Sequence, residues 1–154
     1  MADEKYAKAV FEALCKALEN KGLKFKKDEE AMTILFIVNG DDLPMQFILK
    51  VDAERQLIRL LSPLPFTMSE DKRMEGAIAT CAATFGLTDG SFDYDLTEGK
   101  IIFRLTASFR ESLIGEELFH YMIVCACIAV DEYNDKFLAL DKGLLSITDF
   151  IENE

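Results

Sequence analysis

The stretch SFDYDLTEGKIIFRLTA, residues 91–107, decides the fold class. Its first half alternates Phe92 and Tyr94 with aspartates. In its second half, every second residue from Ile101 to Ala107 is apolar, and these residues alternate with a second, more polar set. This is the pattern of strands that bury one face. The segment Thr97-Glu98-Gly99 between them has the composition of a tight turn. Residues 91–107 therefore predict a β-hairpin with antiparallel strands.

The residues before this hairpin predict one helix and three more strands. Apolar residues recur at three- and four-residue spacing up to Leu18, and Gly22 ends that helix. Residues 31–38, 45–52 and 57–61 read as strands separated by turn residues, and residues 23–27 as a short extended lead-in. We expect Pro63 and Pro65 to stop the third of these strands, because proline cannot donate to a ladder.

Three further helices complete the pattern. Residues 69–85 predict a helix with one apolar stripe, which comprises Met74, Ala77, Ile78, Cys81, Ala82 and Phe85. A long helix follows Gly115 and continues to about residue 137, and a short helical piece covers residues 146–151. The order predicts one α+β domain over residues 1–154, in which helices pack on an antiparallel sheet of about five strands, α-β-β-β-α-β-β-α.

Composition excludes several classes of partner. The chain has 17 basic and 28 acidic side chains and a formal net charge of −11, which repels phosphate backbones and anionic lipid headgroups. We therefore predict that it binds neither nucleic acid nor membranes. The start of the chain lacks the pattern of a signal peptide, and the four cysteines lie in apolar helical stretches, which favours a cytoplasmic protein with reduced, buried thiols.

The residue types that usually carry chemistry form no recognisable site. His120 is the only histidine, and we interpret it as a partly buried, hydrogen-bonded side chain rather than a metal ligand beside Glu116. Cys125 and Cys127 are two residues apart, which sends them to different sides of a helix. The crowded carboxylates near Asp131 favour a solvated face, with a cation or a basic partner as the alternative. We predict no catalytic residue, cofactor or metal, and no enzymatic activity.

The chain resembles the YbjN-like domains of the type III secretion chaperone-like fold. The resemblance rests on the order of elements, on Phe92-Asp93-Tyr94-Asp95 with Gly99-Lys100-Ile101-Ile102-Phe103-Arg104, and on the long apolar helix that reaches Val130-Asp131-Glu132-Tyr133. It implies a curved antiparallel sheet, small acidic cytosolic bacterial proteins, frequent homodimers, and roles in stress and regulation. In the secretion chaperones it also implies the binding of extended protein segments. It implies no enzymatic residues.

One candidate surface follows from the strand pattern. Ile48 and Ile102 fall on the second face of the sheet together with Arg104 and one side of residues 31–38, so this face is too apolar for bare contact with water. Either an element of the same chain covers it, or it is a surface for a protein partner or a homodimer. We predict a non-enzymatic, chaperone-like or regulatory protein-binding module. The alternative is a small-molecule-sensing or enzymatic domain with a pocket between sheet and helices.

Overall fold

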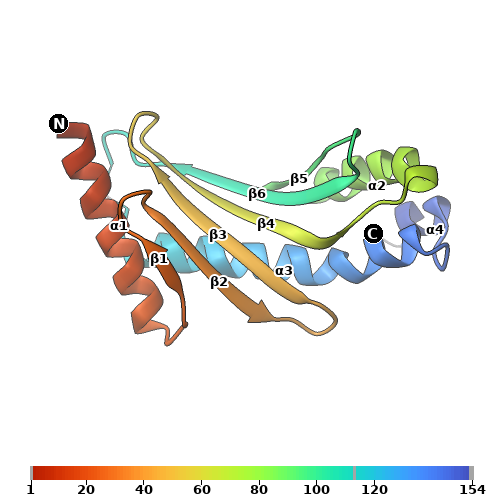
Figure 1. The fold of residues 1–154 in the computed structure, drawn as a ribbon, viewed down its shortest axis with the longest axis horizontal. Helices are drawn as coiled ribbons and strands as arrows, with labels where there is room; N and C mark the ends of the chain where they lie inside the picture. Colours follow the sequence, from red (N-terminus) through yellow and green to blue (C-terminus); the bar gives the residue numbers. More distant parts are fainter. Residues whose placement is uncertain (1, 113, 153–154) are drawn as a thin grey trace.

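The computed structural model describes residues 2–112 and 114–152, which form one sheet and a layer of helices (Figure 1). The elements follow in the order α1 (Ala2–Asn20), β1 (Lys26–Asp28), β2 (Thr33–Asn39), β3 (Pro44–Asp52), β4 (Leu57–Thr67), a 3-10 turn (Glu70–Lys72), α2 (Arg73–Phe85), β5 (Ser91–Tyr94), β6 (Lys100–Ser108), α3 (Glu116–Asp141) and α4 (Ile147–Glu152). The α+β class and the antiparallel sheet are confirmed.

The sheet has six strands in the order β1-β2-β3-β4-β6-β5, and every neighbouring pair is antiparallel. The prediction of about five strands was one short. The sixth strand is β1, where Lys26 pairs with Leu35 and Asp28 with Thr33. The sequence predicted only a short extended lead-in over residues 23–27 here, because all three residues of β1 are exposed and show no apolar alternation.

Strand β4 runs through the two prolines that were expected to end it. It pairs with β3 only as far as Leu61, which lies opposite Ile48, and beyond that point it pairs with β6 alone. Pro63 lies opposite Ile102, just before a shift in register. Because one side of β4 has lost its neighbour there, a residue without a backbone N–H breaks no ladder on that side. The prediction was therefore wrong about the end of this strand.

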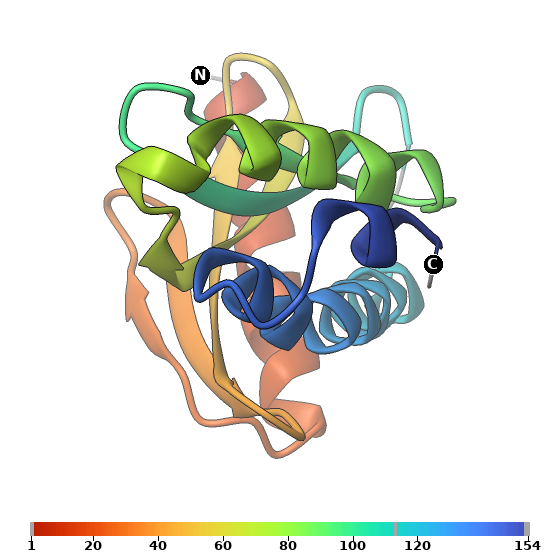
Figure 2. The ribbon, with the colours of Figure 1, turned by 90° about the vertical axis from the view of Figure 1, so that its right-hand side faces the viewer.

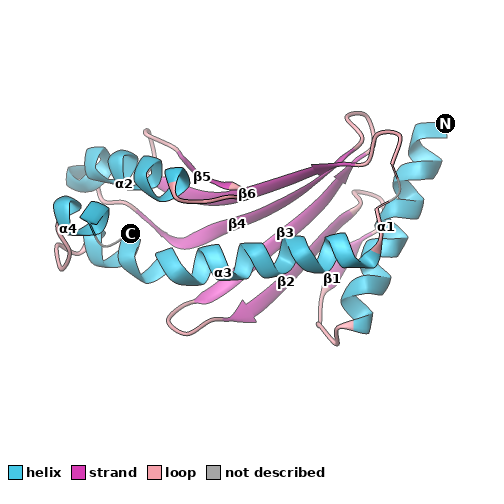
Figure 3. Ribbon diagram, turned by 180° about the vertical axis from the view of Figure 1, so that it is seen from behind, coloured by secondary structure: helices cyan, strands magenta, loops and turns pink. Residues whose placement is uncertain are grey.

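The helices cover one face of the sheet, and the other face carries none (Figures 1 and 3). Helix α3 runs along the covered face, α1 lies across one end, and α2 and α4 lie together at the other end (Figure 2). Alternate strand residues point into this layer, as Phe36, Phe47 and Leu60 do, and they are fully or almost fully buried. Elements that are distant in sequence thus enclose a single core.

Near β5 and β6, a cluster of aromatic rings occupies the space between sheet and helices. Phe92 of β5 lies 5.4 Å from Phe103, 5.3 Å from Phe137 and 5.5 Å from Tyr133, measured between ring centroids. Phe150 of α4 lies 5.2 Å from Phe137 in the same way. Edge-to-face and tilted contacts at these separations add stabilisation beyond the burial of apolar area. This ring cluster fixes α3 and α4 against β5 and β6.

Candidate functional site

The predicted surface residues lie together on the uncovered face of the sheet. Ile48 pairs with Leu61, and Leu61 pairs with Arg104, so these three side chains form one row across adjacent strands. Ile102 lies opposite Pro63, one step along the strands. We call this surface the outer sheet face. It consists of the outward residues of the six strands, and its apolar centre comprises Leu35, Ile37, Ile48, Leu61, Pro63 and Ile102.

No helix of the described chain lies over the outer sheet face (Figures 1 and 2). Ile37 is 64% exposed, and the other members of the apolar centre are partly exposed. Two shallow grooves flank this centre. One, of about 450 Å³, is lined by Lys24, Phe25, Lys26, Leu35, Phe36 and Ile37. The other, of about 330 Å³, lies around Pro63, Pro65 and Ile102. For the described residues, the first alternative for this face, coverage by an element of the same chain, is therefore excluded.

A second apolar surface lies on α2, and it was not predicted as exposed. Met74 is 73% exposed, Ile78 48% and Phe85 93%, and Ile151 of α4 adds a fourth exposed apolar side chain. With Ala77, Cys81 and Ala82 they line a groove of about 560 Å³. We call this surface the α2 face. It is the stripe that the sequence placed on one side of the helix, and the structure turns that stripe toward solvent.

The opposite side of α2 packs on the sheet because its residues are small. Its buried positions are Gly76, Ala79, Thr80 and Ala83. A Cβ atom on Gly76 would lie 2.6 Å from Oη of Tyr94, so only glycine permits this approach to β5. The Tyr94 hydroxyl donates a hydrogen bond to the carbonyl of Arg73 at 2.8 Å, and Thr84 Oγ1 accepts one from the Phe92 amide at 2.9 Å. Close backbone contact therefore selects the less apolar side of the helix as the inner one.

The cysteines differ in their surroundings. Cys15 is buried, Cys125 and Cys127 are partly buried, and all four cysteines are free thiols. Burial raises the pKa of the Cys127 thiol to about 11, and it also raises the pKa of Cys15. A thiol with a raised pKa is a poor nucleophile at neutral pH. Cys81 is exposed on the α2 face, so the prediction that it is buried was wrong.

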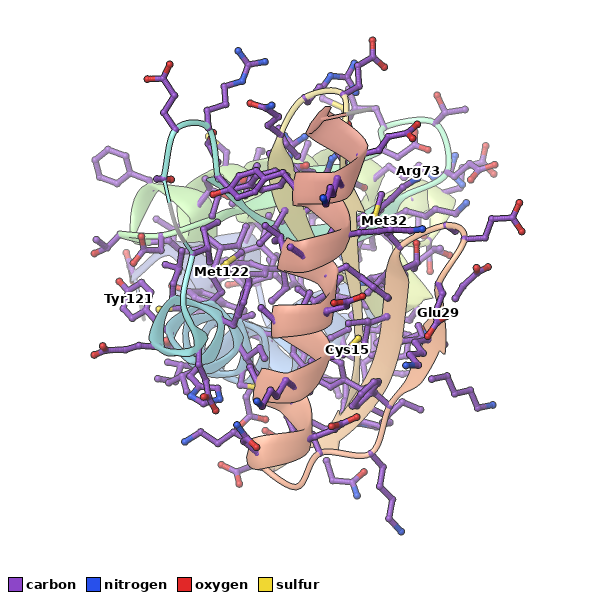
Figure 4. The ribbon with its side chains drawn as sticks, turned by 90° about the vertical axis from the view of Figure 1, so that its left-hand side faces the viewer. Cys15, Glu29, Met32, Arg73, Tyr121 and Met122 are labelled. Carbon is purple, nitrogen blue, oxygen red and sulfur yellow. The ribbon has the colours of Figure 1, made fainter. Side chains whose placement is uncertain are left out.

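A groove of about 420 Å³ runs between α1 and the β1 edge, with Cys15 facing it and Glu29 at its rim (Figure 4). Lys27 and Glu29 form an ion pair of 3.0 Å there. The remaining charged residues of its lining are Lys8, Glu12, Lys16 and Glu19. The mixed charges select neither an anion nor a cation, so this groove carries no evident chemistry.

His120 joins α3 to the end of α1, as its interpretation as a hydrogen-bonded side chain predicted. Its Nε2 lies 3.2 Å from the carbonyl oxygen of Ala17 and 3.6 Å from Oε1 of Glu116. Glu116 in turn accepts a hydrogen bond of 3.0 Å from the side-chain amide of Asn20. These contacts link the end of α1 to the first turns of α3.

The crowded carboxylates of α3 meet the β2–β3 turn. The Asp131 carboxylate accepts a hydrogen bond from the Asp41 amide at 2.9 Å. Asp135, Asp131 and Asp41 together raise the pKa of Asp42, with Asp135 as the largest cause. Among the described residues, no group of three or more His, Cys, Asp or Glu side chains is placed to hold a metal ion. Asp131 therefore has a structural role, since it anchors the turn to the helix.

Asp52, on the outer sheet face, makes stability depend on pH. The Arg55 amide donates to its carboxylate at 2.9 Å, and the guanidinium groups of Arg55 and Arg59 lie 3.4 Å away. The amide is the largest cause that lowers the pKa of Asp52. A lowered folded pKa contributes stability above the unfolded pKa of about 3.9, and this contribution is lost as the pH falls through the folded value.

Asp52→Asn is therefore expected to reduce the free energy of unfolding at neutral pH by at most about 1 kcal/mol. The side-chain oxygen of asparagine can still accept the hydrogen bond from the Arg55 amide, so only the negative charge is lost. Thermal unfolding of both proteins from about pH 7 to about pH 3 measures this difference. It should shrink as the pH falls below about 4. A difference that stays constant across this range would contradict an electrostatic role.

Comparisons with known proteins support the fold. No known protein family and no curated protein sequence matches the chain. Among solved structures, the crystal structure of YbjN from E. coli, provisionally described as a transcription regulator, superposes with a TM-score of 0.62. The match covers 81% of this chain and 91% of that chain at 12% sequence identity. It confirms the predicted similarity to the YbjN fold. Within the described residues, none of the helices is both long and apolar enough to cross a membrane.

Proposed function

We propose that the chain is a non-enzymatic protein-binding module that acts as a homodimer in a chaperone-like or regulatory role. The observation that carries this proposal is the α2 face, where an apolar stripe with Phe85 93% exposed lies outside a filled core. A contiguous exposed apolar surface of this kind usually marks a protein interface. The similarity to YbjN, described provisionally as a regulator, agrees with a regulatory role.

The α2 face suits a second copy of the chain. A protein with a net charge of −11 repels its own copies, so a self-association surface has to be free of like charge. Residues 76–85 of α2 contain no charged side chain. The stripe also runs the length of the helix, which spans about 20 Å. Two antiparallel α2 helices related by a two-fold axis would place Met74 of one protomer near Phe85 of the other.

The outer sheet face remains free in such a dimer and suits a protein segment. It lies on the side of the sheet away from the helices (Figure 2). Its apolar centre is continuous across β2, β3, β4 and β6, which gives an extended segment a row of side chains to contact. The two functions thus use separate surfaces, one for the second copy and one for the bound segment.

The packing of the interior argues against the alternative of a small-molecule pocket. Aromatic rings in direct contact occupy the space between the helices and the sheet near β5 and β6. They belong to Phe92, Phe103, Tyr133, Phe137 and Phe150. A ligand there would have to displace buried aromatic side chains, which costs several kcal/mol for each ring. We therefore favour partners that bind at the surface.

The dimer is tested by light scattering coupled to size exclusion. We expect the unmodified protein to have twice the mass of one chain, and Ile78→Glu to weaken dimerisation by at least about tenfold, because the substitution buries an unpaired carboxylate in an apolar contact. Ile37→Glu is the matched control, since it introduces the same group at a 64% exposed position on the outer sheet face. It should leave the dimer intact.

Cys81 provides a second, independent measurement. In the antiparallel pairing it lies near the two-fold axis, so mild oxidation should link two chains through Cys81, and Cys81→Ser should abolish this product. A wild-type protein that is monomeric at high micromolar concentration would refute the homodimer. A dimer that is lost in Ile37→Glu and retained in Ile78→Glu would move the dimer contact to the sheet.

A further inference from the structure

The outer sheet face carries a positive charge on a strongly acidic protein. Its outward strand residues include five basic side chains and three acidic ones. The basic ones are Lys26, Lys50, Arg59, Lys100 and Arg104, and the acidic ones are Asp28, Asp52 and Asp93. The whole chain has the opposite balance, 17 basic against 28 acidic. The outward strand residues therefore carry an excess of basic groups on the face that no helix covers, although most basic side chains of the chain lie elsewhere.

Two of these basic groups are available to a partner. The other three have carboxylate neighbours: Arg104 forms an ion pair of 2.9 Å with Asp93, Lys100 one of 2.6 Å with Glu98, and Arg59 lies 3.4 Å from Asp52. In the described part of the chain, no carboxylate lies within ion-pair distance of Lys26 or Lys50. Lys26 lies opposite Leu35, and Lys50 is two residues from Ile48 on the same side of β3. Each free ammonium group thus borders the apolar centre.

The grooves that flank the centre have the same character. The groove beside Ile37 is lined by Lys24, Lys26 and apolar side chains, and no carboxylate lines it. The groove beside Ile102 is lined by two prolines, by other uncharged residues and by Lys100, whose ammonium group is paired with Glu98. A ligand that follows the face from one groove to the other would meet apolar contacts along its path and the free ammonium groups of Lys26 and Lys50 at its border.

We infer that the outer sheet face binds an acidic, apolar protein segment in extended conformation, with apolar side chains on the centre and carboxylates toward Lys26 and Lys50. This inference rests on the proposed segment-binding function and names the chemistry of the segment. Charge complementarity selects this occupant, because opposite potentials across an interface favour association and like charges exclude wrong partners. A second copy is disfavoured here, since two such faces would bring their basic groups together.

The segment is identified by selection of a random dodecapeptide display library against the full-length chain. We expect the enriched peptides to combine Asp or Glu with Leu, Ile or Phe. Binding of a labelled enriched peptide is then measured by fluorescence anisotropy. The double variant Lys26→Glu/Lys50→Glu should weaken binding by about tenfold, and added salt should weaken binding to the unmodified protein.

The matched control is Lys5→Glu/Lys142→Glu, which changes the net charge by the same amount at exposed positions on α1 and just after α3. It should change affinity by no more than about twofold, because neither lysine belongs to a strand of the outer sheet face or lines one of its two grooves. Thermal melts of both double variants confirm that they are folded. Equal losses in the two double variants would overturn the inference, since only net charge would then matter.

Other outcomes separate this inference from the function on which it rests. Enrichment of basic or uncharged peptides would overturn the acidic segment and leave segment binding in place. A library that yields no binder would refute segment binding and the inference together. Binding of a labelled DNA duplex that is lost in Lys26→Glu/Lys50→Glu would assign the face to nucleic acid instead, and loss of the dimer in Ile102→Glu would assign it to a second copy.

Discussion

Replacing Phe137 with alanine is expected to lower the free energy of unfolding by about 3–5 kcal/mol. The ring is fully buried on α3 and contacts Phe92 at 5.3 Å and Phe150 at 5.2 Å between centroids. Its removal loses the transfer free energy of the side chain and leaves a cavity in the ring cluster that joins α3, α4 and β5. Urea denaturation measures the change, with an unchanged dependence on urea if the unfolded state is unaffected.

Phe85→Ala is the matched control for this prediction, since it removes the same side chain from a 93% exposed position. We expect it to change the stability of the protomer by no more than about 0.5 kcal/mol. It should act on self-association instead, because Phe85 belongs to the α2 face. If both alanine variants destabilise the protomer equally, the assignment of inner and outer sides of α2 is wrong.

Gly90→Ala is expected to destabilise the protein by about 2–4 kcal/mol, through backbone strain and overpacking together. Gly90 has a φ of +82° in the loop that leads into β5. A Cβ atom there would lie 2.5 Å from Cζ of Phe103 and 2.9 Å from the carbonyl oxygen of Arg104. Phe103 is fully buried, so its ring has no space to move away.

Gly22→Ala separates the two contributions. Gly22 has a φ of +70°, and nothing lies within 4 Å of a Cβ atom placed on it. This variant therefore carries the backbone strain without the clash. The strain alone is expected to cost about 1–2 kcal/mol. The difference between the two glycine variants, measured by chemical denaturation, isolates the collision with Phe103. Equal effects would mean that the β5 loop moves to accommodate the methyl group.

The elements that the sequence predicted best have regular apolar periods. The hairpin of residues 91–107 appears as β5 and β6, and the second sheet face was located correctly through Ile48, Ile102 and Arg104. A two-residue period assigns alternate side chains to opposite faces whatever surrounds the strand, so these assignments follow from local geometry. The basic character of that face was missed, because its lysines and arginines come from four strands that are distant in sequence.

The elements that were missed depend on neighbours. Strand β1 has no apolar side chain and exists because β2 pairs with it. Strand β4 continues past Pro63 because β3 no longer pairs with it at that point. Both outcomes depend on which strand pairs with which. The local pattern of apolar residues in a sequence does not specify the pairing partner of a strand.

The sequence by itself determined the fold class, the helix and strand periods and the pair of faces of the sheet, since each follows from side-chain spacing within one element. Only the tertiary structure decided which side of α2 faces water. The more apolar stripe stays outside because Gly76, Ala79 and Ala83 let the opposite side approach Tyr94 of β5 closely. Fit between backbones, rather than hydrophobicity alone, made the α2 face an exposed surface.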